Sequence, residues 1–152
     1  MIRYLKKLNK TVIIDPKHHE ISKYAGVDYI TPNIKELMVY IGGFNDDSEL
    51  ENKVYSLMIN NDIKNILLTR SEEGLSHFSI KNNKIKHVRS SVEKVEVFDV
   101  SGAGDSVVAI LSLMLNSNIS IEKNLNLINK VGAKSVSKFG TYSVKYEDLT
   151  NE

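Results

Sequence analysis

The sequence predicts an α/β fold whose sheet is mostly parallel and covered by helices on both faces. Two observations support this prediction. Short runs that are apolar almost throughout, at residues 11–14, 27–30 and 66–69, are typical of strands buried on both faces. Stretches with apolar residues at helical spacing alternate with these runs, as expected when helices connect neighbouring parallel strands.

Turn residues indicate where each element ends. The first strand closes before Pro16 and the second before Pro32, because proline cannot continue a strand ladder. Asn33 opens a helix that the glycine pair at 42–43 ends. The remaining expected elements are a helix over 48–59, a hairpin of 75–80 and 85–88 around two asparagines, and helices over 104–116 and 121–138.

The composition is that of one ordinary globular domain, and we expect a single domain over residues 1–152. With 20 Lys and Arg against 19 Asp and Glu, the net charge of +1 favours neither nucleic acid nor a membrane surface as partner. There are no cysteines, which excludes disulfides, thiol nucleophiles and thiolate metal sites. No apolar run approaches the roughly 18 residues of a membrane span, and no signal peptide is evident, so a cytoplasmic protein is expected.

Residues 99–105, Asp-Val-Ser-Gly-Ala-Gly-Asp, are the most informative stretch. Two glycines just before an apolar helix leave backbone N–H groups uncovered at its positive end, which is an anion site. Asp105 then lies in the first helical turn, where a carboxylate beside a phosphate is useful for accepting a proton from an attacking hydroxyl. The alternative is a glycine-rich turn in which Asp105 only complements the helix dipole.

This stretch resembles the second signature of the ribokinase-like (pfkB) carbohydrate kinases, Asp-Thr-x-Gly-Ala-Gly-Asp, with Val100 in place of the threonine. The resemblance implies a ribokinase-like three-layer α/β/α sandwich. It also implies that Gly102, Ala103 and Gly104 form an anion hole for the transferring phosphoryl group, that Asp105 is the catalytic base and that Asp99 belongs to the nucleotide site. The variant here is most similar to the D-glycero-β-D-manno-heptose 7-phosphate kinases of lipopolysaccharide precursor synthesis.

Asn33 and Glu36 form a second motif, Asn-x-x-Glu, at the start of a helix. This spacing is that of a capping box, in which each side chain bonds the other residue's backbone. In the ribokinase-like kinases the same motif organises Mg²⁺ and phosphate, largely through water. The resemblance therefore implies ATP and Mg²⁺ as cofactors, with Asn33 and Glu36 acting on the metal through water. Both interpretations can hold together.

Five further positions match the family outside these two motifs. Lys17, in Asp-Pro-Lys, is expected to face the nucleotide phosphates, although a solvated turn lysine is the alternative. Thr69 and Arg70 are expected at the phosphate and ribose end, the alternative being a polar exit from a strand. Gly74 follows in the same segment, Thr-Arg-Ser-Glu-x-Gly, and Asn129 lies on the helix that would close the adenine pocket.

The histidines and serines predict no other chemistry. His18, His19, His77 and His87 lack the spacing of metal ligands and are expected on the surface. No serine lies in the sequence order of a hydrolase triad.

The resemblance covers only the C-terminal, nucleotide-binding half of such a kinase. The other half would carry most of the sugar contacts, so this chain is expected to be a fragment, a split-gene product or a decayed gene. The predicted function is transfer of the γ-phosphoryl of ATP to a hydroxyl of a phosphorylated sugar, heptose 7-phosphate by resemblance, once the missing half is supplied. The alternatives are a non-catalytic nucleotide-binding remnant or partner subunit, and a kinase for another sugar or nucleoside. An open strand edge and uncovered apolar surface also predict a homo-oligomer or a partner chain.

Overall fold

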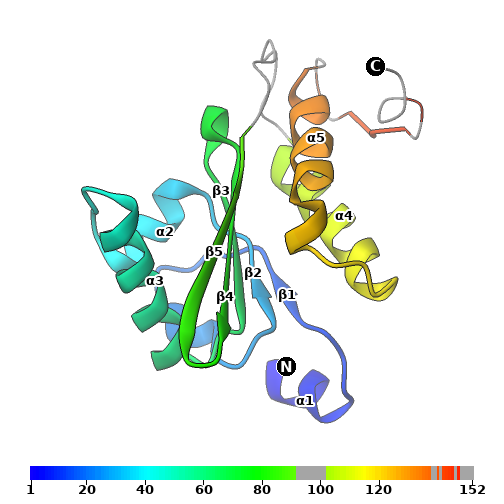
Figure 1. The fold of residues 1–152 in the computed structure, drawn as a ribbon. Coiled ribbons are helices and arrows are strands. Elements are labelled where there is room, and N and C mark those ends of the chain that lie inside the picture. Colours follow the sequence, from blue (N-terminus) through cyan, green and yellow to red (C-terminus); the bar gives the residue numbers. More distant parts are fainter. Residues whose placement is uncertain (92–101, 138–139, 141, 146, 148–152) are drawn as a thin grey trace. The chain divides into compact units, whose positions relative to one another are not determined.

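The computed structural model describes residues 1–91, 102–137, 140, 142–145 and 147 (Figure 1). Its strands are β1 (Ile13–Ile14), β2 (Tyr29–Ile30), β3 (Asn65–Thr69), β4 (Leu75–Lys81) and β5 (Lys84–Ser90). Its α-helices are α1 (Ile2–Lys7), α2 (Ile34–Ile41), α3 (Asp47–Asn60), α4 (Ala103–Asn116) and α5 (Leu125–Val136). Three short 3₁₀ turns are η1 (Ile21–Tyr24), η2 (Ser71–Glu73) and η3 (Glu122–Asn124). Among the described residues, no helix is long and apolar enough to cross a membrane.

The chain divides into two compact units. Met1–Arg70 with Ser76–Val88 form unit 1, and Ser71–Leu75 with Arg89–Glu152 form unit 2. The sequence-based expectation of one domain over residues 1–152 remains a prediction.

The sheet has the order β1-β2-β3-β4-β5, and its first three strands are parallel. Tyr29 pairs with Ile13 on one side and with Asn65 on the other. Asn82 and Asn83, both at positive φ, form the two-residue turn that joins β4 to β5. The α/β class and the hairpin predicted from the sequence are confirmed.

The first two strands are shorter than predicted because polar contacts replace the ladder at their starts. The Val12 carbonyl accepts from the N–H groups of both Asp28 and Tyr29, at 3.1 Å each. The N–H of Val12 in turn donates to the Asp28 carboxylate at 2.9 Å. Only Ile13 and Ile14 therefore pair regularly with β2.

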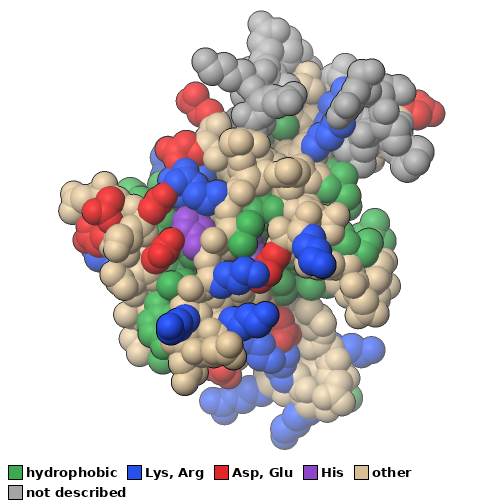
Figure 2. All heavy atoms as spheres, viewed as in Figure 1, with side chains coloured by type: hydrophobic (Ala, Val, Ile, Leu, Met, Phe, Trp, Pro, Cys, Tyr) green, Lys and Arg blue, Asp and Glu red, His purple; other side chains and the backbone are tan. Residues whose placement is uncertain are grey.

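The core of unit 1 lies between the sheet and the two helices α2 and α3, which lie on one side of it in Figure 1. Leu37 of α2 and Leu50 and Val54 of α3 are fully buried, as are Ile30 of β2 and Ile66 of β3. Burial of each such side chain contributes about 1.5–3 kcal/mol. Along β5 exposed positions alternate with partly buried ones, and only Ser90 is buried. On the face of the molecule shown in Figure 2, cationic and anionic side chains are interspersed.

In unit 2, α4 and α5 pack against each other. Val107 and Leu111 of α4 and Ile128 and Val131 of α5 are buried. The predicted helix over 121–138 is instead the 3₁₀ turn η3 followed by α5. The side-chain Nδ2 of Asn124 donates to the Ser120 carbonyl at 2.9 Å. Such local bonding between a side chain and the backbone favours a turn over a continuous α-helix.

Asp28 connects α1 to the start of the sheet. Its carboxylate accepts from Lys6 Nζ at 2.6 Å and lies 3.2 Å from Lys64 Nζ. Burial of Asp28 acts to raise the pKa of its carboxyl, but the hydrogen bonds from Lys6, the Val12 N–H and Lys64 outweigh burial and hold that pKa below its ordinary value of 3.8. The ionised carboxylate therefore stabilises the folded state.

This arrangement predicts a pH-dependent contribution to stability. Because the folded pKa is lowered, the contribution is complete above about pH 5 and is lost as the pH falls through the folded pKa. Asp28→Asn should lower the free energy of unfolding by roughly 1 kcal/mol at about pH 7. Urea unfolding of both proteins should show this gap closing toward about pH 2. A gap that stays constant with pH would contradict a role for the charge.

Candidate functional site

The predicted phosphate-side residues of unit 1 meet at one edge of the sheet. Lys17 follows β1, Asn33 follows β2, and Thr69 ends β3. Because these three strands are parallel, their carboxyl ends lie side by side, which is where ligands bind in α/β sheets. Thr69 donates its N–H to the Pro32 carbonyl at 3.0 Å, and Asn33 and Thr69 form a parallel bridge.

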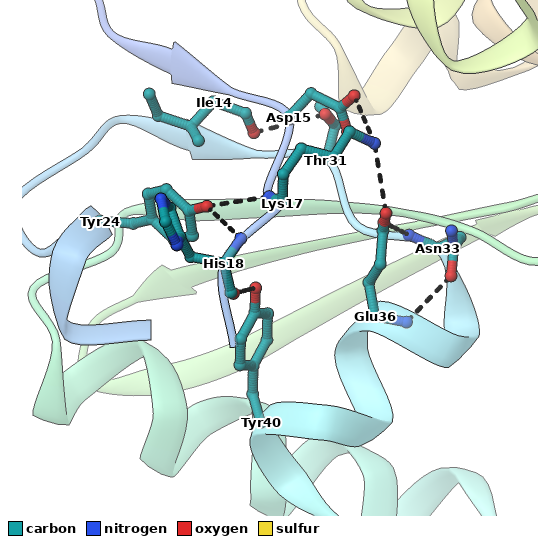
Figure 3. Close-up of polar contacts among 9 residues, drawn as sticks. All are labelled: Ile14, Asp15, Lys17, His18, Tyr24, Thr31, Asn33, Glu36 and Tyr40. Carbon is teal, nitrogen blue, oxygen red and sulfur yellow. Dashed lines mark hydrogen bonds and ion pairs between the residues drawn. The ribbon is translucent and has the colours of Figure 1, made fainter. Parts of the chain in front are cut away.

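Asn33 and Glu36 form the predicted capping box at the start of α2 (Figure 3). Asn33 Oδ1 accepts the Glu36 N–H at 2.9 Å, and Glu36 Oε2 accepts the Asn33 N–H at 2.8 Å. Two N–H groups that a helix start would leave without a partner are thereby satisfied. The capping interpretation of this motif is confirmed.

Lys17 lies between two carboxylates at this edge. Its ammonium is 3.0 Å from Asp15 Oδ2 and 3.3 Å from Glu36 Oε1 (Figure 3). The hydrogen bond to Asp15 is the largest reason that the pKa of the Lys17 ammonium lies above its ordinary value of 10.5, with Glu36 adding to the effect and partial burial opposing it. Lys17 therefore stays cationic at physiological pH.

The side chain of Arg70 turns toward α3. Its guanidinium lies 3.4 Å from both Asp47 Oδ1 and Ser76 Oγ, and its side chain is almost fully buried. The nucleotide role predicted for Arg70 remains a prediction.

In unit 2, the start of α4 has the geometry expected of an anion site. Gly102 is the residue before the helix and adopts a left-handed conformation, with φ of 83°. No side chain among the described residues caps the helix there. Gly104 and Asp105 are exposed, and a Cβ on Gly104 would meet no atom within 4 Å. The positive end of a helix, with its first-turn N–H groups, is a place where proteins bind anions.

Gly74 and Asn129, both predicted for the nucleotide site, lie together in unit 2. Asn129 Nδ2 donates to the Ser90 carbonyl at 3.1 Å and to Ser90 Oγ at 3.0 Å. A Cβ on Gly74 would lie 2.0 Å from that carbonyl oxygen and 2.8 Å from Asn129 Nδ2. The sequence interpretation missed Ser90 and Asn126, which bond each other through their side chains at 2.7 Å, since neither belongs to a motif.

The remaining predicted residue, Asp99, lies outside the described residues. In the part of the chain that is described, no group of three or more His, Cys, Asp or Glu side chains could hold a metal ion directly. The oxygen donors at the sheet edge, the Asn33 amide and the Glu36 carboxylate, suit Mg²⁺ that keeps its waters. Because the Lys17 ammonium already lies at Glu36, a water-mediated contact fits this carboxylate better than direct ligation.

The expectation that all histidines are on the surface is wrong for two of them. His77 is buried with its ring stacked on Tyr29, and the side chain of His87 is only 6% exposed and stacks on Phe78. His77 lies on β4 and His87 on β5, the two strands of the hairpin.

His87 also lies between Ser76 and Glu51. His87 Nε2 is 2.9 Å from Ser76 Oγ, and Nδ1 is 2.9 Å from Glu51 Oε1. This is the order of groups in a hydrolase triad. Ser76 is 0% exposed, however, so its hydroxyl cannot reach a substrate. The three residues therefore form a buried network that connects the hairpin to α3.

Comparison with known proteins identifies the family of this chain. The pattern of the pfkB family carbohydrate kinases matches residues 1–148. The chain belongs to this family.

The relatives it matches are longer than this chain. Bifunctional protein HldE from Psychromonas ingrahamii is 34% identical over 151 residues, and HldE from Yersinia pestis is 33% identical over the same length. Each alignment covers 99% of this chain and 31% of the relative. The chain thus spans about a third of the length of these curated relatives.

Solved structures show the same fold. Phosphofructokinase-2 from Escherichia coli in complex with potassium aligns with a TM-score of 0.83 at 19% identity, over 97% of this chain and 48% of that one. Arabidopsis thaliana ribokinase complexed with ribose and ATP aligns with a TM-score of 0.79 at 20% identity, over 92% of this chain and 46% of that one. The predicted ribokinase-like α/β fold is confirmed.

The contacts at Gly74 predict that no side chain is tolerated there. Gly74→Ala would combine the strain of φ at +84° with a clash against the Ser90 backbone, and should cost roughly 3 kcal/mol or more. Gly26→Ala is the matched control, because φ there is +82° but the nearest atom, Asp62 Oδ2, is 3.9 Å away, and should cost roughly 1 kcal/mol. Denaturant unfolding measures both. Equal costs at the two positions would show that the close approach to Ser90 is not a constraint.

Proposed function

We propose that this chain is the nucleotide-binding and proton-transfer part of an ATP-dependent sugar kinase. Membership of the pfkB family and identity to HldE proteins support this proposal. The observation that carries it is the start of α4, where the left-handed Gly102 precedes a first turn that contains Asp105 and that no side chain of the described residues caps.

In this proposal the backbone N–H groups of Gly102, Ala103 and Gly104 bind the transferring phosphoryl group. They are preorganised donors at the positive end of a helix, so charge that develops on the phosphoryl oxygens is stabilised without rearrangement. Asp105 accepts the proton of the attacking sugar hydroxyl. Its exposure supports this role, since a general base must be accessible to the acceptor.

The remaining site residues serve the nucleotide. Lys17 and Thr69, at the carboxyl edge of the sheet, are assigned to the phosphates, with Arg70 and Asp99. Gly74 and Asn129 are assigned to the base side. Asn33 and Glu36 would hold Mg²⁺ through water, and the ion would neutralise phosphate charge when bound.

For the acceptor we propose heptose 7-phosphate, because residues 15–17, 69–74 and 99–105 resemble the heptose 7-phosphate kinases. Its contacts would come from the part of such a kinase that this chain does not span, supplied by a partner chain. A soluble cytoplasmic location fits this substrate. The second candidate is a nucleotide-binding subunit without activity of its own, because the residues named above are assigned to the nucleotide and to proton transfer and none is assigned to the sugar.

Gly104→Ala tests the anion site, because a methyl group at this position should affect stability and nucleotide binding in opposite directions. A Cβ at this helical position meets no atom within 4 Å, so alanine should stabilise the chain by about 1 kcal/mol. The same methyl group would obstruct a phosphate and should weaken Mg·ATP binding by about tenfold or more. Thermal unfolding and calorimetry measure the two effects. Gly43→Ala is the control: a Cβ there also meets no atom within 4 Å, and Mg·ATP binding should be unchanged. Unchanged Mg·ATP binding in Gly104→Ala would refute the anion site.

Asp105→Asn, used beside that variant, tests whether Asp105 is the catalytic base; a non-catalytic subunit would show no turnover even in the unmodified chain. It should bind Mg·ATP as well as the unmodified chain or slightly better, because a negative charge near the phosphates is removed. Turnover of heptose 7-phosphate, with the acceptor-binding half supplied as a second polypeptide, should fall by about 10²–10⁴. Undiminished turnover together with a lower melting temperature would leave Asp105 only the helix-dipole role.

A further inference from the structure

The loop that carries Lys17 is held by a buried tyrosine. The N–H groups of Lys17 and His18 both donate to the Tyr24 hydroxyl, at 2.9 and 2.8 Å (Figure 3). Tyr24 is 8% exposed, and its ring belongs to the hydrophobic core of unit 1. Its hydroxyl is therefore an acceptor at a fixed position, not a mobile surface group.

A second tyrosine holds the same loop from α2. The Tyr40 hydroxyl donates to the His18 carbonyl at 2.5 Å (Figure 3). Burial, with the nearby Tyr24 and Glu36, raises the pKa of Tyr40 above its ordinary value of 10.0, so its hydroxyl remains a donor at physiological pH. Together the two side chains satisfy three backbone groups of two consecutive residues.

The ion pairs of Lys17 do not fix the loop by themselves. The Lys17 side chain is 70% exposed, and exposed ion pairs contribute little to conformational order. The two tyrosines instead position the backbone of residues 17 and 18, and the backbone fixes the place of the Lys17 Cα from which the side chain extends. Tyr40 also lies one helical turn from Glu36, so both are on one face of α2. Helix α2 thus carries both a residue that holds the loop, Tyr40, and a residue of the capping box, Glu36.

We propose that Tyr24 and Tyr40 are positioning residues that hold Lys17 for binding a nucleotide phosphate. The proposal rests on the proposed function for its ligand. Neither tyrosine touches the ligand; each acts through the backbone of the loop. The alternative is that both hydroxyls only stabilise the fold.

Tyr24→Phe and Tyr40→Phe test this proposal, because each removes one hydroxyl and keeps the ring. Tyr55→Phe is the matched control: the Tyr55 hydroxyl also donates to a backbone carbonyl, that of Asn83, away from the loop. The first measurement is the rate at which an activated ester acylates Lys17, mapped by mass spectrometry with the exposed Lys35 as internal reference. The second measurement is calorimetry with Mg·ATP.

In either loop variant, Lys17 should separate from Asp15 and Glu36 and become more accessible to the ester. Acylation of Lys17 relative to Lys35 should then rise by about threefold, as expected for the loss of exposed ion pairs. Mg·ATP should bind about fivefold more weakly, as expected when the proposed contact of Lys17 with a phosphate is weakened. Tyr55→Phe should change neither quantity.

A lower melting temperature with an unchanged acylation ratio would overturn the proposal and leave the tyrosines a structural role. If Tyr24→Phe does not fold, Tyr40→Phe decides the question. If the unmodified chain binds no Mg·ATP, the proposed function fails, while the acylation ratio still decides whether the tyrosines position Lys17.

Discussion

Parallel pairing of β1, β2 and β3 is the constraint on which the sheet-edge site depends. Tyr29 of β2 pairs with Ile13 on one side and with Asn65 on the other, so the three strands run together and end at one edge. A shift of one residue in this register would turn the buried Ile30 and Ile66 toward the opposite face. The apolar core therefore determines where the polar residues that follow each strand are placed.

Structural and functional roles overlap in the residues at this edge. Glu36 uses one carboxylate oxygen to cap α2 and the other to contact Lys17. The capping box and the proposed role in binding Mg²⁺ are therefore not alternatives. The cap holds the carboxylate in one orientation, and a charged group with a fixed orientation is what phosphate and magnesium binding require.

What could be predicted from the sequence was local. Asn33 and Glu36 are three residues apart, and Asn82 and Asn83 are adjacent, so neighbouring residues alone specify the cap and the turn. Contacts between distant residues escaped prediction. The hydroxyl of Tyr40 bonds a carbonyl 22 residues away, and His87 bonds Glu51 36 residues away. No local pattern indicates such partners, because they are chosen by the packing of whole elements.

Amide NMR during a titration with Mg·ATP tests the central claim, that this chain binds a nucleotide. Two groups of amides should shift: those of Ala103, Gly104 and Asp105 in unit 2, and those of Lys17 and His18 in unit 1. The amides of Ile59 and Asn60, at the exposed C-terminal end of α3, should not shift. Shifts confined to α3, or a titration that moves neither group, would contradict the account.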